Sequence, residues 1–190
     1  PNFVAGRLGQ AISLDGVDDY VEITGYKGIC IADPNDPNSV QPAFSISAWV
    51  NTSGNGDIMG WGSTAGGSSR VEFRINEDRL RCESGGNVQG DNTLPDNEWI
   101  HVAVTVKENA TISYPDVKLY LNGQDDTRKT TDPDALNVVA GYDVTIGRRH
   151  SAAQRWYSGL IDEVRIYERA LSDAEVAWLA GRIKPFDNPF

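Results

Sequence analysis

The sequence predicts an all-β protein, a two-sheet antiparallel β-sandwich that ends in one short C-terminal helix. Apolar and polar residues alternate with a period of two over most of the chain, which is typical of strands with one buried face. The 190 residues include 19 glycines, 9 prolines and 5 tryptophans but a single methionine, a composition typical of loop-rich β proteins. Two packed sheets require strands with one apolar face each, so these observations favour a sandwich.

The alternation also gives the order of the strands. Seven runs carry it, at residues 44–50, 71–75, 79–83, 99–106, 117–121, 144–147 and 159–167. Residues 76–78 form a hairpin turn between the second and third runs. Asn122-Gly123 follows the fifth run and is a strong hairpin signal, because both central residues of a type I′ turn need positive φ.

One helix follows the last strand. Ser172 and Glu175 have the spacing of a capping box, and Leu171 and Val176 have the spacing of a hydrophobic staple around it. Gly181 marks the end of the helix.

The composition shows no break that would divide the chain into several domains. We expect one domain over residues 1–183 and a linker-like tail over residues 184–190. The first residues lack an initiator methionine and a signal peptide, so we expect a piece of a longer protein, covalently linked to other domains of the parent chain.

Charge and hydropathy exclude two classes of partner. Seventeen Lys and Arg residues stand against 27 Asp and Glu residues, a net charge of −10, whereas a nucleic-acid binder needs a basic surface. No run approaches the roughly 18 apolar residues that a membrane-spanning helix needs. The two cysteines, Cys30 and Cys82, are too few for a disulfide scaffold, and the sequence leaves open whether they form one bridge or stay separate thiols.

Several segments carry a resemblance to a known family. They lie at residues 9–21, 44–50, 98–104, 119–123, 159–167 and 170–172. Together and in order, they resemble the laminin-G-like jelly rolls of the concanavalin A-like lectin/glucanase superfamily. The resemblance implies a two-sheet jelly roll, often with a bound calcium, that serves as an accessory module of secreted or cell-surface multidomain proteins. Many such modules bind glycans.

Catalytic patterns are missing from the sequence. Asp162 and Glu163 point to opposite faces of their strand, so they do not form the pair of carboxylates that glycoside cleavage uses. Glu72 and Glu83 lie among arginines, which favours ion pairing over proton donation. No nucleophile elbow and no phosphate-binding loop is present, and the chain has only 2 histidines. We therefore expect that the chain is not an enzyme.

Acidic residues near the N-terminus and on the last predicted strand suggest a cation site. Asp162 shares its strand face with Leu160, so it points inward and needs a cation or hydrogen-bond donors. Asp15, Asp18 and Asp19 crowd into five residues around a glycine turn, and such oxygen ligands suit Ca²⁺. With the resemblance added, we expect a structural calcium bound by Asp18 and Asp162 with help from Asp15 or Asp19. The alternative is an ordinary turn and an Asp162 that caps a backbone amide.

Two loops combine aromatic rings with polar side chains, as sugar-binding sites do. One is residues 57–69, and the other follows residue 147. The candidate ligand-binding residues in them are Trp61, Arg148, Arg149, Arg155, Trp156 and Tyr157. Guanidinium groups match carboxylates well, so the second loop favours a polysaccharide with uronate groups. The alternatives are that Trp61 packs over the core edge and that acidic neighbours hold the arginines.

These observations favour a non-catalytic carbohydrate-binding module of a larger secreted protein, with polysaccharide or glycan as its partner. The alternative is an adhesion or structural module that recognises a protein partner or acts as a spacer. A diverged glycan hydrolase or lyase is the third class, and fold analogy alone does not decide among them.

Overall fold

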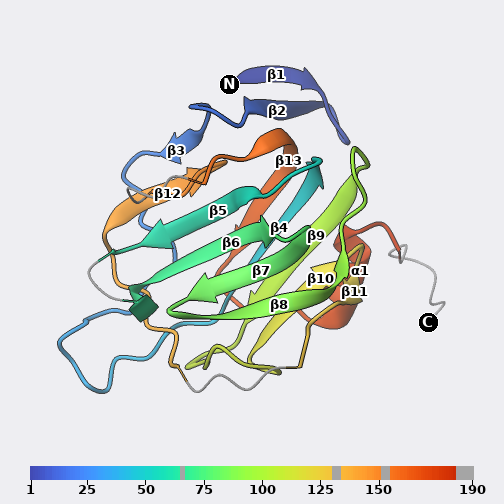
Figure 1. The fold of residues 1–190 in the computed structure, drawn as a ribbon. Coiled ribbons are helices and arrows are strands. Elements are labelled where there is room, and N and C mark those ends of the chain that lie inside the picture. The colour runs from blue at the N-terminus through green and yellow to red at the C-terminus, as the bar shows by residue number, and fades with distance from the viewer. Residues whose placement is uncertain (65–66, 130–133, 151–154, 183–190) are drawn as a thin grey trace.

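The computed structural model describes residues 1–64, 67–129, 134–150 and 155–182. Its strands form two antiparallel sheets, as Figure 1 shows. The seven-stranded sheet has, in spatial order, β1 (Asn2–Ala5), β2 (Gln10–Asp15), β13 (Ser158–Tyr167), β4 (Phe44–Asn51), β9 (Ile100–Val106), β10 (Val117–Leu121) and β11 (Gln124–Asp125). The six-stranded sheet has β3 (Val21–Ile23), β12 (Tyr142–Ile146), β5 (Gly56–Gly62), β6 (Arg70–Asn76), β7 (Arg79–Ser84) and β8 (Gly86–Thr93).

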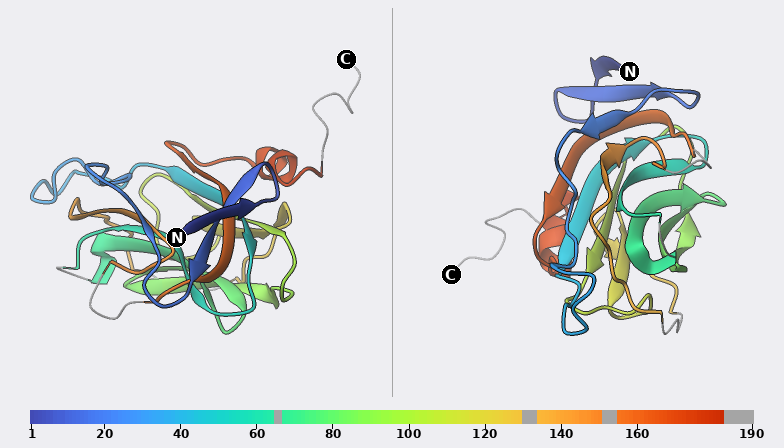
Figure 2. Two further views of the ribbon diagram at one scale, coloured as in Figure 1. Left: turned by 90° about the horizontal axis from the view of Figure 1, so that it is seen from above. Right: turned by 90° about the vertical axis from the view of Figure 1, so that its left-hand side faces the viewer.

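The two sheets pack face to face, so the fold is the all-β sandwich that the sequence predicts. The right-hand view of Figure 2 shows the layers edge-on, with the helix α1 (Asp173–Leu179) on the outer side of the seven-stranded sheet. Ala103, Tyr120, Leu171 and Val176 form a small apolar cluster beneath this helix. The capping box of Ser172 and Glu175 is present, which confirms the predicted start of the helix.

The core lies between the inner faces of the two sheets. Alternate residues of the predicted strands fill it, among them Ile46, Phe73, Val104, Leu119 and Ile161. The β5 strand takes up residues 57–62 of the loop expected at residues 57–69. Three of its seven residues are glycines and Ile58 and Met59 are adjacent, so its sequence lacks the apolar–polar alternation that predicts a strand. A Cβ at Gly60 would lie 2.8 Å from the Val71 carbonyl oxygen, which explains one of these glycines.

A loop covers part of the outer face of the six-stranded sheet. This β12–β13 loop comprises residues 147–157, of which 151–154 lie outside the described residues. The Asp57 amide donates to the Arg155 carbonyl (3.1 Å), and the Gly147 amide donates to the Ile58 carbonyl (3.1 Å). Polar residues on this sheet face are consequently buried, and the candidate site is built on them.

Both cysteines are free thiols. Of the two arrangements that the sequence leaves open, one bridge or two separate thiols, the structure has the second. Cys82 lies in the core on β7, and Cys30 donates a hydrogen bond to the Lys27 carbonyl (3.2 Å). Among the described residues, no helix has the length and apolar character to cross a membrane. The tail expected at residues 184–190 lies outside the described part of the chain.

Candidate functional site

Two arginines of the β12–β13 loop are held by buried glutamates. Arg149 lies 2.7 Å from Glu72 (Nε to Oε1), and Arg155 lies 3.0 Å from the other Glu72 oxygen. Arg155 also reaches Glu83 at 3.4 Å. Glu72 is only 1% exposed, so its two carboxylate oxygens meet guanidinium groups in a place that water does not reach. For these two arginines, the structure has the acidic partners that the alternative reading of the sequence expects.

The same network extends along the sheet. Arg70 donates from Nε to Glu72 (2.8 Å), and Arg74 donates from Nε to Glu83 (3.1 Å). Arg81 lies 3.3 Å from Glu83. Burial alone would raise the pKa of Glu83, but the charges of Arg74 and Arg155 outweigh it and hold that pKa below its usual range.

Asp57 is the exception in this network. It is 1% exposed, and neither of its carboxylate oxygens has a hydrogen-bond partner among the described residues. Burial, together with the Glu72 charge, raises the pKa of Asp57 to about 7, although Arg155, Arg74 and Arg149 act in the opposite direction. Near neutral pH this carboxyl group is therefore partly protonated.

Arg148 belongs to a separate group that lies at the surface. Its guanidinium carbon lies 3.6 Å from the centroid of the Tyr20 ring and 5.9 Å from that of Trp156. The two rings are 6.0 Å apart at 46°. Tyr20, Arg148 and Trp156 are each partly exposed, and we call them the aromatic–arginine cluster. The only acidic partner of Arg148 among the described residues is Glu22, at 3.6 Å.

Tyr20 is a member of this cluster that the sequence did not single out. It precedes β3, and the pairing of Val21 with Ile146 brings it beside the end of β12. The only sequence signal at Tyr20 is its place in the segment 9–21 that carries the family resemblance. Its contact with Trp156 depends on a pairing between strands more than 100 residues apart in the chain.

Trp61 and Tyr157 do not lie where a ligand could reach them, which corrects the expectation for both residues. Trp61 is fully buried; its Nε1 donates to the Ile29 carbonyl (3.1 Å) and its ring packs edge-on against Phe44. A Cβ at Gly28 would lie 2.4 Å from the indole, because the chain crosses directly over it. Tyr157 is also fully buried, and its hydroxyl donates to the Leu160 carbonyl (3.3 Å).

Three of the four candidate metal ligands lie together. One carboxylate oxygen from each of Asp15, Asp18 and Asp19 lies within 4.8 Å of the others, so this group could hold a metal ion. Asp15 Oδ1 accepts hydrogen bonds from the amides of Val17, Asp18 and Asp19 at 2.8, 3.2 and 3.3 Å. These bonds, that from Val17 foremost, lower the pKa of Asp15 and keep it ionised.

Asp162 does not join this group, which corrects the expectation of a shared site. Ser158 is the β13 partner of Asp15, and Asp162 follows four residues later, about 13 Å further along the strand. Asp162 is buried, but on the outer face of the sheet beside Trp49 and not on the core side as expected. Its Oδ2 accepts from the Leu8 amide (2.8 Å) and its Oδ1 from the Glu163 amide (2.7 Å). Backbone donors therefore satisfy this carboxylate without a cation.

A match to a protein-family model identifies the superfamily of this chain. The family model described as the concanavalin A-like lectin/glucanases superfamily, of the laminin-G type, matches residues 16–177. The chain belongs to this superfamily. No curated protein matches the chain.

Several solved structures share the fold at low sequence identity. Domain 4 of the extracellular arabinanase AbnA from Geobacillus stearothermophilus, in complex with arabinotriose, has a TM-score of 0.61 and 22% identity, over 94% of this chain and 80% of that one. The CBM40 of an IT-sialidase from Ruminococcus gnavus, bound to α2,3-sialyllactose, has a TM-score of 0.64 and 13% identity, over 90% and 96% of the two chains. Mouse laminin α1 domains LG4-5 have a TM-score of 0.58 and 13% identity, over 85% of this chain and 46% of that one.

The concanavalin A-like superfamily includes glucanases, so the carboxylates of this member bear on catalysis. Glu72 and Glu83 are engaged by arginines, and backbone amides hold Asp162. Glu163 pairs with Arg165. None of these four carboxylates is an unpaired group that faces a cleft.

Proposed function

We propose that this chain is a non-catalytic carbohydrate-binding module of a larger secreted protein, and that it binds an acidic polysaccharide at the aromatic–arginine cluster. The observation that carries the proposal is the stacking of the Arg148 guanidinium on Tyr20 beside a partly exposed Trp156. An aromatic ring next to a guanidinium group suits a sugar ring with a carboxylate, since the ring takes the C–H face and the guanidinium takes the charge. The structurally similar domains in complex with arabinotriose and sialyllactose support a saccharide ligand, and of these two sugars sialyllactose is the acidic one.

Charge on this face favours an acidic ligand although the protein as a whole is acidic. The cluster and the adjoining network contain six guanidinium groups and four carboxyl groups, those of Arg70, Arg74, Arg81, Arg148, Arg149 and Arg155 against Glu22, Asp57, Glu72 and Glu83. Among these ten groups the guanidinium groups are in excess, which favours an anion, whereas the three carboxylates of Asp15, Asp18 and Asp19 before Tyr20 act against it unless a cation binds them. In this proposal, Arg149 and Arg155 hold the loop and add positive electrostatic potential, whereas Arg148 contacts the ligand.

Replacing Trp156 by alanine should weaken binding of an acidic oligosaccharide about tenfold or more, because a stacking aromatic at the centre of a site is usually worth more than 1 kcal/mol. The measurement is isothermal titration with sialyllactose and with an oligouronate. Trp178→Ala is the matched control, since Trp178 is 48% exposed on α1 and lies outside the cluster. Arg148→Ala should weaken binding and also reduce its dependence on salt. Unchanged affinity in Trp156→Ala would place the site elsewhere.

We also propose that Asp15, Asp18 and Asp19 hold a structural calcium. Their carboxylates suit Ca²⁺, a hard cation that takes six to eight oxygen ligands, and the Asp15 bonds with three amides leave its Oδ2 oxygen for the ion. The turn leads directly into Tyr20, and Asp15 pairs with Ser158, two residues after Trp156. A bound ion would thus fix the turn that positions the aromatic–arginine cluster.

Removal of calcium should lower the melting temperature by about 5–10 °C. An ion present at about 100 times its Kd stabilises the folded state by about 2.7 kcal/mol, and each kcal/mol shifts the melting temperature of a domain this size by about 2–4 °C. The measurement is calorimetry with and without chelator. Asp18→Asn should abolish the difference, whereas Asp162→Asn, whose partners are amides, should retain it. A melting curve that chelator leaves unchanged would contradict the calcium proposal.

A further inference from the structure

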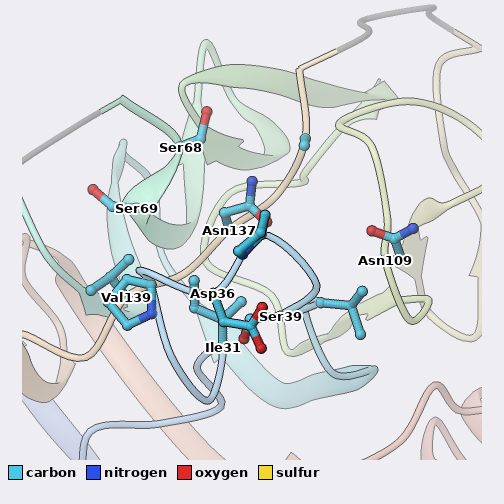
Figure 3. Close-up of a pocket in the computed structure, with 12 residues that line it drawn as sticks. Ile31, Asp36, Ser39, Ser68, Ser69, Asn109, Asn137 and Val139 are labelled. Carbon is cyan, nitrogen blue, oxygen red and sulfur yellow. The ribbon is translucent and has the colours of Figure 1, made fainter.

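A pocket lies at one end of the sandwich, away from the aromatic–arginine cluster. It has a volume of about 620 Å³ and is shown in Figure 3. Its walls come from residues 31–40, from the segment around Asn137, and from the short 3₁₀ helix η1 (Gly67–Ser69). The described lining residues are Ile31, Pro34, Asp36, Pro37, Ser39, Val40, Ser68, Ser69, Asn109, Ala135, Asn137 and Val139. Small-molecule sites have volumes in this range, about 300–1,000 Å³.

The three walls are tied together by backbone hydrogen bonds. The Ile31 amide donates to the Val138 carbonyl (2.8 Å), and the Asn137 amide donates to the Ser68 carbonyl (3.1 Å). Beneath them lies the fully buried Gln41. Its Oε1 accepts from the Val138 amide (2.8 Å) and its Nε2 donates to the Ile29 carbonyl (3.2 Å). The pocket is therefore part of the folded framework.

The outer wall is stiffened by its own side chains. Asp33 and Asp36 each accept a hydrogen bond from the amide two residues later, at 2.8 and 2.9 Å. Ser39 Oγ accepts from the Asp33 amide (3.1 Å), and prolines occupy positions 34 and 37. Because these bonds and rings already restrict the backbone, a ligand would meet little ordering cost at this wall.

Two side-chain amides of the pocket have no partner in the described protein. Asn109 and Asn137 use their backbone groups in hydrogen bonds, but their carboxamides make none. Figure 3 shows Asn109 on one side of the pocket and Ser68 and Ser69 on the other, with Asn137 and Asp36 between them. A carboxamide offers both donors and an acceptor in one plane, which matches the two hydroxyls of a sugar ring.

The lining also decides the charge of the ligand. Its described residues include no lysine, arginine or histidine, and Asp36 is the ionisable residue among them. In a protein with a net charge of −10, an anion would be repelled here. Pro34, Pro37 and the 42% exposed Val40 offer apolar surface for C–H groups. We infer that this pocket is a second binding site, one that takes a neutral saccharide.

This site is separate from the one proposed above and does not depend on it. The pocket reaches Val139, just before β12 begins, whereas the aromatic–arginine cluster lies beside the end of that strand. The two sites share no residue, and their ligands differ in charge. A failure of one proposal is therefore distinguishable from a failure of the other.

The test is isothermal titration of the full chain with arabinotriose, as a neutral probe, and with sialyllactose. The double variant Asn109→Ala/Asn137→Ala should weaken arabinotriose binding about tenfold or more and leave sialyllactose binding unchanged. Trp156→Ala should show the reverse pattern. Asn2→Ala is the matched control, because Asn2 is exposed on β1, outside the pocket.

A second variant keeps the test decisive if the double variant unfolds. Val40→Arg places a long side chain at the mouth of the pocket without removing a hydrogen bond, and it should also weaken arabinotriose binding. Melting curves identify any variant that has lost its fold. The proposal is overturned if arabinotriose and other neutral trisaccharides fail to bind the wild-type chain, or if they bind folded pocket variants as tightly as wild type.

Discussion

Replacing Glu72 by glutamine is expected to destabilise the protein by about 3–5 kcal/mol, the usual effect of removing one partner from a buried ion pair. Glu72 lies between Arg70, Arg149 and Arg155. Glutamine keeps the shape of the side chain but removes its negative charge, so guanidinium groups stay buried without compensation. Two of these three arginines come from the β12–β13 loop, so the loop should loosen together with the loss of stability.

The measurement is chemical denaturation of wild type and Glu72→Gln at neutral pH. Glu108→Gln is the matched control, since Glu108 is exposed and has no ion pair among those the structure describes. Its effect should stay within about 0.5 kcal/mol. If Glu72→Gln changes stability as little as the control does, the ion-pair network does not hold the loop.

Replacing Asp57 by asparagine should instead stabilise the protein above about pH 7. Burial raises the pKa of Asp57 from 3.8 to about 7, so the folded protein binds a proton that the unfolded chain releases between these values. The free energy of unfolding therefore falls as the pH rises from about 4 to about 7, and it levels off above. The difference is on the order of 4 kcal/mol at most, from about 1.4 kcal/mol per pKa unit.

Asparagine has no charge to bury, so Asp57→Asn should be more stable than wild type at about pH 8 and should lose this part of the pH dependence. At about pH 4 the two proteins should differ little, because Asp57 is protonated there in the folded state. Denaturation at both pH values measures the effect, with the exposed Asp96→Asn as control. If the stability difference between Asp57→Asn and wild type does not grow as the pH rises, Asp57 is not a buried group with a raised pKa.

The sequence predicted those strands in which apolar and polar residues alternate, whether or not the polar face is exposed. The alternation at residues 44–50, 71–75 and 117–121 is strict, and each range is a strand in the structure. The β5 strand was missed because three of its seven residues are glycines and Ile58 and Met59 are adjacent, so its sequence has no period of two. Its glycine neighbours place Trp61 in a flexible loop on the sequence alone, but Trp61 packs in the core against Phe44.

The candidate site was predicted in part. Local composition identified the arginine- and aromatic-rich loop, but it could not tell which arginine stays available. Arg155 finds Glu72 and Glu83 at separations of 83 and 72 residues, and only the strand order brings them together. Strand parity wrongly predicted that Asp162 points into the core: Ile161 takes that position, and Asp162 lies beside Trp49 on the outer face, where the Leu8 segment buries it. Parity also does not fix position along a strand, and so it could not separate Asp162 from Asp18.

The claim that an acidic glycan binds at the aromatic–arginine cluster can be tested by one NMR titration. The chain has 5 tryptophans, and each gives an indole N–H signal that a Trp→Phe variant assigns. With sialyllactose or an oligouronate, whichever binds more tightly, the Trp156 signal should move in proportion to saturation, while those of the buried Trp61 and the distant Trp178 should stay in place. A Trp156 signal that stays unmoved when the ligand is saturating, or that moves less than another tryptophan, would contradict the account.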